Sequence, residues 1–144
     1  MKKVMVKSLF DCLDYVIDYN GVATFAIISI QDSREGGFGF RFTKTPFCRD
    51  VLTIQFDDAE FAFDDDIQLF TREDAEKIID FIRKNKTEVE HLIIHCYAGQ
   101  SRSLAVGAFA VKMLGGNNSA YFNGHNPNML VYNTLNEVFE EKYS

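Results

Sequence analysis

The chain has 144 residues, of which 47% are hydrophobic and 14 are phenylalanine, so its composition predicts one domain, residues 1–144, with a buried core. The formal net charge of −6 disfavours nucleic acid or an anionic membrane as a partner. Three cysteines without metal-ligand spacing favour the reducing cytoplasm. No apolar run approaches the roughly 20 residues of a membrane-spanning helix, so we expect no membrane attachment.

The first part of the chain predicts short strands around one helix. Residues 3–6 predict a strand, and residues 9–19 predict a helix with its apolar side chains on one face. The apolar and β-branched residues 22–30 predict a buried strand. Residues 31–37 are typical of a loop, and residues 38–42 alternate as an edge strand does. Arg34, Arg41 and the phenylalanines of this region are expected either to form a lip around an aromatic phosphate or to pack as a flap.

The middle of the chain continues the alternation of strands and helices. Residues 51–56 predict a strand that ends in Asp57-Asp58, and a second acidic group follows at residues 64–66. Thr71 and Asp74 have the spacing of a capping pair at the start of a helix. Residues 91–95 predict the next strand. The pattern predicts an α/β fold with a mostly parallel central sheet and helices on both faces.

The stretch from residue 95 to residue 103 joins that strand to a helix-forming segment, which begins near Leu104 and stops at Gly115-Gly116. At a helix N-terminus the first backbone N–H groups have no intrahelical partner, and the helix dipole adds partial positive charge. We therefore expect a phosphate-binding loop. Its backbone is formed by Tyr97, Ala98, Gly99, Gln100, Ser101 and Arg102.

Individual side chains make this anion site chemically reactive. Cys96 lies at the strand end, where the field favours thiolate over thiol, and it must be reachable from solvent to act. Arg102 offers a planar fork for two phosphate oxygens, and Gly99 lets the loop curl. The Ser103 hydroxyl is placed to reach the thiolate or to cap the helix. His95 either orients the loop through its backbone or packs as an ordinary buried histidine.

This segment closely resembles the signature loop of the protein tyrosine phosphatase superfamily. His95, Cys96, Gly99, Arg102 and Ser103 match its defining positions, and the intervening residues resemble those of the compact dual-specificity branch. The resemblance implies a cysteine-dependent phosphatase with a phosphocysteine intermediate and no metal or other cofactor. The segment ending in Pro127-Asn128 resembles the opening of a late helix in these enzymes, which implies that Asn128 hydrogen-bonds to the active-site loops; its other interpretation is a helix cap.

The resemblance also implies an aspartate that protonates the leaving oxygen, on a separate loop upstream of the cysteine. We favour Asp58, because it follows a strand that fixes it on a rigid element. Asp57 and the acidic group at residues 64–66 stay as alternatives.

The function expected from these residues is hydrolysis of phosphate monoesters, with a phosphorylated protein or peptide as substrate. Phosphotyrosine is favoured over phosphoserine or phosphothreonine. A pseudophosphatase that only binds phosphate is the alternative in another functional class. Phosphatases of RNA 5′ ends or phosphoinositides use the same chemistry, and sulfurtransferases or arsenate reductases also place a thiolate in an anion-binding loop.

Overall fold

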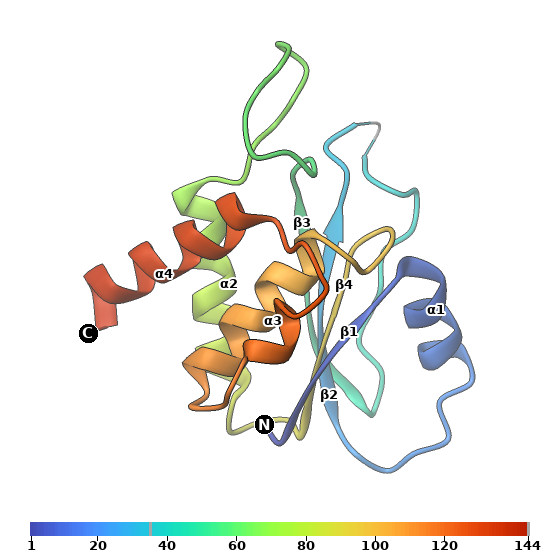
Figure 1. The fold of residues 1–144 in the computed structure, drawn as a ribbon. Helices are drawn as coiled ribbons and strands as arrows, with labels where there is room; N and C mark the ends of the chain where they lie inside the picture. The colour runs from blue at the N-terminus through green and yellow to red at the C-terminus, as the bar shows by residue number, and fades with distance from the viewer. Residues whose placement is uncertain (35, 144) are drawn as a thin grey trace.

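The computed structural model describes residues 1–34 and 36–143. A central sheet of four parallel strands forms the middle layer (Figure 1). In spatial order the strands are β1 (Lys3–Lys7), β4 (His91–His95), β2 (Phe25–Gln31) and β3 (Cys48–Gln55). The predicted α/β fold with a parallel sheet is confirmed. All four strands have their carboxyl ends at the same edge, which is where sites form in such sheets.

Helices cover both faces of the sheet (Figure 1). Three of them pack together on one face: α2 (Arg72–Asn85), α3 (Arg102–Met113) and α4 (Met129–Tyr143). The other face carries α1 (Leu9–Ile17), and a short 3₁₀ turn, η1 (Ser119–Tyr121), precedes α4. Within the described residues, each helix is too short or too polar to cross a bilayer.

Strand β2 lies between β4 and β3 and is buried along its whole length. Its alternate residues Ala26, Ile28 and Ile30 pack into the core beneath α2, α3 and α4. Phe25 and Ile27 point to the other face and join the smaller core beneath α1, together with Cys12, Phe42, Cys48 and Ile93. At its carboxyl end this second face becomes polar, with Ser29 and Gln31. On this face, the side chains of β2 therefore change from apolar to polar toward the carboxyl end of the strand.

Residues 38–42 do not form the edge strand that their alternation predicted. Gly36, Gly37 and Gly39 adopt positive φ angles of 74°, 89° and 72°, which turn the chain away from an extended path. The Gln31 side chain donates to the Phe40 carbonyl and accepts from the Phe38 N–H, so these backbone groups are satisfied without a strand partner. We call this irregular segment, residues 36–42, the flap. Glu35, in the predicted loop 31–37, and Ser144 lie outside the described residues.

Candidate active site

The loop of residues 96–101, here called the cysteine loop, connects the end of β4 to the start of α3 (Figure 1). Gly99 has a φ of +75°, and a Cβ atom there would lie 2.7 Å from the Lys7 carbonyl carbon and the Ser8 nitrogen. The Leu9 N–H, at the start of α1, donates to the Tyr97 carbonyl at 3.0 Å. The loop is therefore pressed against the junction of β1 and α1, and only glycine fits at its closest approach.

The Cys96 sulfur lies within the curl of this loop. It accepts a hydrogen bond from the Gly99 N–H at 3.2 Å and lies 3.0 Å from the Ser103 hydroxyl oxygen. Both contacts suit a thiolate, which accepts hydrogen bonds and needs donors around it. As a whole residue Cys96 is 3% exposed, which is less than the sequence-based chemistry required. Access to the sulfur therefore depends on the residues around the loop.

Arg102 is the first residue of α3, and it is 4% exposed. Its Nη1 donates to the Phe56 carbonyl at 2.8 Å and forms an ion pair with Asp32 at 2.8 Å. Its Nε is buried without a hydrogen-bond partner among the described residues. Such an orphaned donor suits an oxyanion, which would satisfy it. The sequence-based analysis missed Asp32, although its place directly after a buried strand was a usable signal.

Asp58 contacts the cysteine loop from the loop that follows β3, residues 57–70, here called the aspartate loop. Its Oδ1 accepts hydrogen bonds from the Ser101 hydroxyl at 2.8 Å and from the Asn128 amide at 3.0 Å. Asn128 is buried, and its amide also donates to the Ala59 carbonyl at 3.2 Å. Its backbone N–H donates to the Ser101 carbonyl at 3.2 Å. Asn128 thus holds the aspartate loop and the cysteine loop together.

Asp57, the neighbouring residue, has a different environment. Its carboxylate accepts hydrogen bonds from the Ser33 N–H and hydroxyl and from the Gln68 N–H, at 3.1, 2.8 and 2.9 Å. Burial by itself would raise the pKa of Asp57, but these donors and the nearby Arg34 outweigh it and lower the pKa below its ordinary value. A carboxyl held ionised in this way is a poor proton donor, and its contacts anchor the loop instead.

Among the described residues, the acidic group at residues 64–66 makes no hydrogen bond or ion pair with the cysteine loop. Asp64 accepts a hydrogen bond from the Asp66 N–H at 2.8 Å. Asp65 and Asp66 instead line a hollow of about 580 Å³ with Ser33, Arg34 and Gln68.

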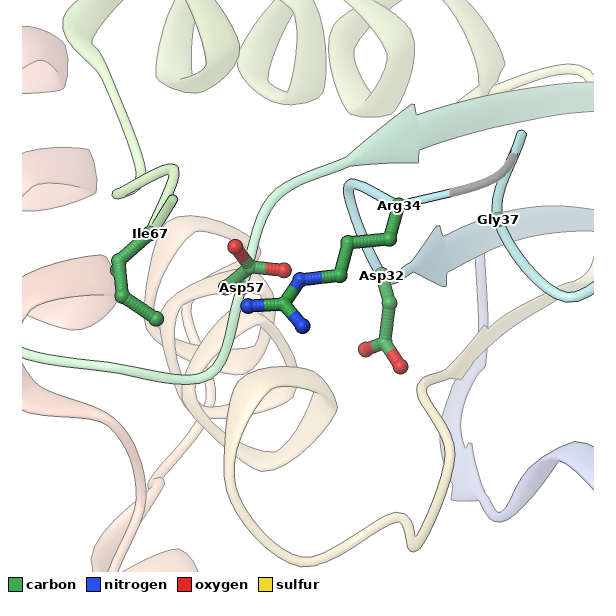
Figure 2. A pocket seen from close by; sticks show the side chains of 5 residues that line it. All are labelled: Asp32, Arg34, Gly37, Asp57 and Ile67. Carbon is green, nitrogen blue, oxygen red and sulfur yellow. The ribbon is translucent and has the colours of Figure 1, made fainter. Parts of the chain in front are cut away.

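A second hollow, of about 500 Å³, lies between the aspartate loop and the segment after β2. Figure 2 shows the Arg34 guanidinium between the carboxylates of Asp57 and Asp32. Ile67 lies beyond Asp57, on the side away from Arg34. Because Asp32 is also the ion-pair partner of Arg102, this hollow adjoins the anion site. Arg34 therefore lies beside the site, as one sequence-based alternative expected, but between carboxylates that offset its charge.

Three aromatic rings surround one side of the cysteine loop. Tyr97 is 49% exposed, and its ring centroid lies 5.7 Å from that of Phe38 and 6.2 Å from that of Phe10. Phe42 is buried, with its ring centroid 5.2 Å from that of His95. Arg41, which the lip hypothesis included, has an exposed side chain. Phe10, Phe38 and Tyr97 form one aromatic group at the cysteine loop, here called the aromatic rim.

His95 is fully buried, and its Nδ1 lies 3.0 Å from the Cys96 carbonyl oxygen. A carbonyl only accepts, so Nδ1 carries the proton. Burial lowers the pKa of His95, and the positive charge of Arg102 lowers it further, which keeps the ring neutral. His95 therefore combines its two interpretations: it is a packed, buried histidine at the end of β4, and it contacts the backbone of the cysteine loop. Within the described residues, no three His, Cys, Asp or Glu side chains are grouped as metal ligands.

No protein-family model matches the chain, and no curated protein matches its sequence. Its fold is similar to that of several solved structures. Human DUSP28 aligns with a TM-score of 0.61 at 14% identity, over 96% of this chain and 92% of that one. OH1 from the Orf virus, a tyrosine phosphatase, aligns with a TM-score of 0.60 at 14% identity, over 98% and 83%. A human tyrosine phosphatase-like serine/threonine/tyrosine-interacting protein aligns with a TM-score of 0.56 at 20% identity, over 89% and 82%. The chain has the fold of the compact dual-specificity and tyrosine phosphatases.

Proposed function

We propose that the chain is a cysteine-dependent phosphatase that hydrolyses phosphate monoesters, with phosphotyrosine in a protein or peptide as the favoured substrate. The observation that carries this proposal is the surroundings of the Cys96 sulfur. A loop N–H and a hydroxyl contact it, at the N-terminus of the helix that begins with Arg102. Because the reaction needs a reduced thiol, we place the protein in a reducing compartment such as the cytoplasm.

In the first step the phosphate is held by backbone N–H groups of residues 97–102 and by the Arg102 guanidinium. Its negative charge competes with Asp32 for that guanidinium. The Cys96 thiolate attacks phosphorus, so a sulfur–phosphorus bond forms and the phosphorus–oxygen bond to the leaving group breaks. Asp58, which is exposed and bound to Ser101, gives its proton to the leaving oxygen.

In the second step water attacks the phosphocysteine, and Asp58, now ionised, accepts the proton from that water. The sulfur leaves as a thiolate, which the Gly99 N–H and the Ser103 hydroxyl stabilise. Phosphate is released, and the site returns to its starting state. The aromatic rim formed by Phe10, Phe38 and Tyr97 favours an aryl leaving group such as tyrosine over a short alkyl one.

The test is turnover of p-nitrophenyl phosphate by the purified chain and by Cys96→Ser. We expect vanadate-sensitive hydrolysis that the substitution lowers by about 10⁴-fold or more, with binding of phosphate retained. Mass spectrometry after acid quenching should detect one phosphate on the peptide that contains Cys96. All three cysteines are buried, but burial raises the pKa of Cys12 to about 12 and that of Cys48 to about 11, so both stay thiols. Under the proposal, iodoacetate should therefore modify Cys96 first. Full activity in Cys96→Ser, or an unreactive Cys96, would contradict the proposal.

Other results would assign the same site to another function. Phosphate binding without turnover in the unmodified chain would identify a binding module. Turnover of thiosulfate or arsenate without phosphatase activity would identify a sulfurtransferase or an arsenate reductase. Preference for RNA 5′ phosphates or phosphoinositides over phosphotyrosine peptides would keep the chemistry and change the substrate class.

A further inference from the structure

Two polar residues lie on β2 in a part of the sheet where apolar residues are expected. Ser29 is 0% exposed and Gln31 is 1% exposed. They are two positions apart, so they share the face of β2 that also carries Phe25 and Ile27. A buried polar side chain costs stability unless it is hydrogen-bonded, so these two residues need partners.

The partners connect Ser29 and Gln31 to the nucleophile. Ser29 lies 2.6 Å from His95 Nε2, across the register pair that joins β2 to β4. The Gln31 Nε2 donates to the Ser29 hydroxyl oxygen at 3.1 Å, and His95 Nδ1 donates to the Cys96 carbonyl at 3.0 Å. Four buried groups thus form one chain of hydrogen bonds that ends at the peptide of Cys96.

The other end of this chain holds the flap. Gln31 Oε1 accepts from the Phe38 N–H at 2.8 Å, and Gln31 Nε2 donates to the Phe40 carbonyl at 2.8 Å. These two bonds fix which amide atom is oxygen and which is nitrogen, because Phe38 supplies a donor and Phe40 an acceptor. Phe38 in turn packs on Tyr97, the residue that follows the nucleophile.

The partners of this hydrogen-bond network then fix the position of each of its protons. The Cys96 carbonyl requires the proton on His95 Nδ1, so the neutral ring presents an acceptor at Nε2. The Ser29 hydroxyl must therefore donate to His95, and its lone pair accepts from Gln31. A proton added at Nε2 would leave the Ser29 hydroxyl without an acceptor in this network. From the Phe38 N–H to the Cys96 carbonyl each side chain accepts from the group before it and donates to the next, an arrangement in which hydrogen bonds strengthen one another. The bond from Gln31 to the Phe40 carbonyl runs back to the flap.

We propose that Gln31 and Ser29 are positioning residues, which couple the flap around Phe38 to the peptide that carries the Cys96 nucleophile. The inference rests on the proposed function for the meaning of that nucleophile. Gln31 holds Phe38, which packs against Tyr97, and Ser29 holds His95 in one tautomer. Because Gln31 also binds Ser29, one network makes both contacts.

The experiment compares Ser29→Ala, Gln31→Met and a control, Thr53→Val, in the full chain. Thr53 is the register partner of Ser29 on β3, and its hydroxyl is outside this network. Thr53→Val therefore controls for the removal of a hydroxyl at the same level of the sheet. Three measurements are made: steady-state kinetics with p-nitrophenyl phosphate, imidazole ¹⁵N NMR of His95 against pH, and hydrogen exchange of the Phe38 N–H.

We expect both network variants to lower kcat by about ten- to a hundredfold, with a smaller change in KM, because the nucleophile is misaligned. In Ser29→Ala the NMR midpoint of His95 should rise, since the donor that favours the neutral ring is gone. In Gln31→Met the Phe38 N–H should exchange faster, and the His95 signals should also change, because Ser29 loses its donor. Thr53→Val should match the unmodified chain in all three measurements.

The decisive result is the effect of Gln31→Met on His95, which it does not touch directly. If Phe38 exchanges faster while kcat and the His95 signals stay as in the unmodified chain, the coupling does not exist and the inference is wrong. If Gln31→Met does not fold, Ser29→Ala decides through the His95 midpoint and kcat. If the unmodified chain hydrolyses no phosphate monoester, the proposed function fails, whereas the NMR and exchange data still decide whether the network couples flap and nucleophile.

Discussion

The two loops that meet at the candidate site are held in place in different ways. The cysteine loop is fixed along its length, since Gly99 fits closely against the start of α1, Tyr97 binds Leu9 and the sulfur binds its own loop. The aspartate loop is fixed near its ends, through Asp57 and through the contacts of Asn128. Its middle carries Phe61 and Phe63, which are 69% and 67% exposed.

This difference separates two requirements of the proposed chemistry. The nucleophile needs inward-facing N–H groups, which a short loop before a helix supplies from its own backbone. The proton donor needs only to reach the leaving group, so a single side chain held by Asn128 and Ser101 is sufficient. The first requirement is met locally, whereas the second depends on residues far apart in the chain.

Between the two loops as supports, the largest expected effect comes from removing the proton of Asp58 while its side chain stays in place. Asp58→Asn keeps an oxygen that accepts from Ser101 and Asn128 but cannot protonate the leaving oxygen. We expect kcat to fall by about 10²–10⁴-fold, and further for alkyl than for aryl phosphates, because alkoxides are poorer leaving groups. Steady-state kinetics on both substrates measure this. Asp65→Asn, in the same loop, is the control, and an equal loss there would show that loop position rather than the proton is responsible.

The close fit of the cysteine loop predicts a large effect of Gly99→Ala. The added Cβ would lie 2.7 Å from backbone atoms of Lys7 and Ser8, so the loop must move, and we expect kcat/KM to fall by about a hundredfold. The matched control is Gly115→Ala, which has a φ of +88° but no heavy atom within 4 Å. Both variants should lose about 1–3 kcal/mol of unfolding free energy from backbone strain, but only Gly99→Ala should lose activity. Equal activity in the two would argue against the close fit.

The anchoring role of Asp57 predicts a pH-dependent loss of stability. Its folded pKa lies below the unfolded value of about 3.9, so its stabilising contribution is present above that value and is lost as the pH falls through the folded pKa. Asp57→Asn should therefore lower the unfolding free energy by about 1 kcal/mol at pH 7, a modest figure because the group is largely solvated. Urea unfolding should show the two proteins converging below about pH 4. A difference that stays constant with pH would exclude this explanation.

The smallest effect is expected in the middle of the aspartate loop. Phe61→Ser and Phe63→Ser remove exposed rings that contact each other, with their centroids 6.0 Å apart. The unfolding free energy should change by no more than about 0.5 kcal/mol, as for most surface substitutions. Turnover of p-nitrophenyl phosphate, which is too small to reach far beyond the site, should stay within about twofold. A large loss of turnover would mean that the middle of this loop also takes part in positioning Asp58.

The sequence by itself determined most strands and helices and the cysteine loop, because these depend on neighbours in the chain, whereas the order of the strands in the sheet does not. Strand Phe25–Gln31 follows from its apolar run, and the contacts of Cys96 with Gly99 and Ser103 follow from a strand, a tight turn and a helix in succession. The flap at residues 38–42 was less predictable, since its alternation suggested an edge strand while its glycines and Gln31 prevented one.

Only the tertiary structure decided which distant side chains reach the site. Asp57 and Asp58 are adjacent in the sequence, yet only Asp58 meets Ser101 and Asn128, whereas Asp57 turns to Ser33. The same holds for Asp32 on Arg102 and for Gln31 behind His95. The physical reason is that parallel strands bring their carboxyl ends to one edge, where loops from separate parts of the chain compete for the same donors and acceptors. Which residues make these contacts cannot be predicted from neighbouring residues in the sequence.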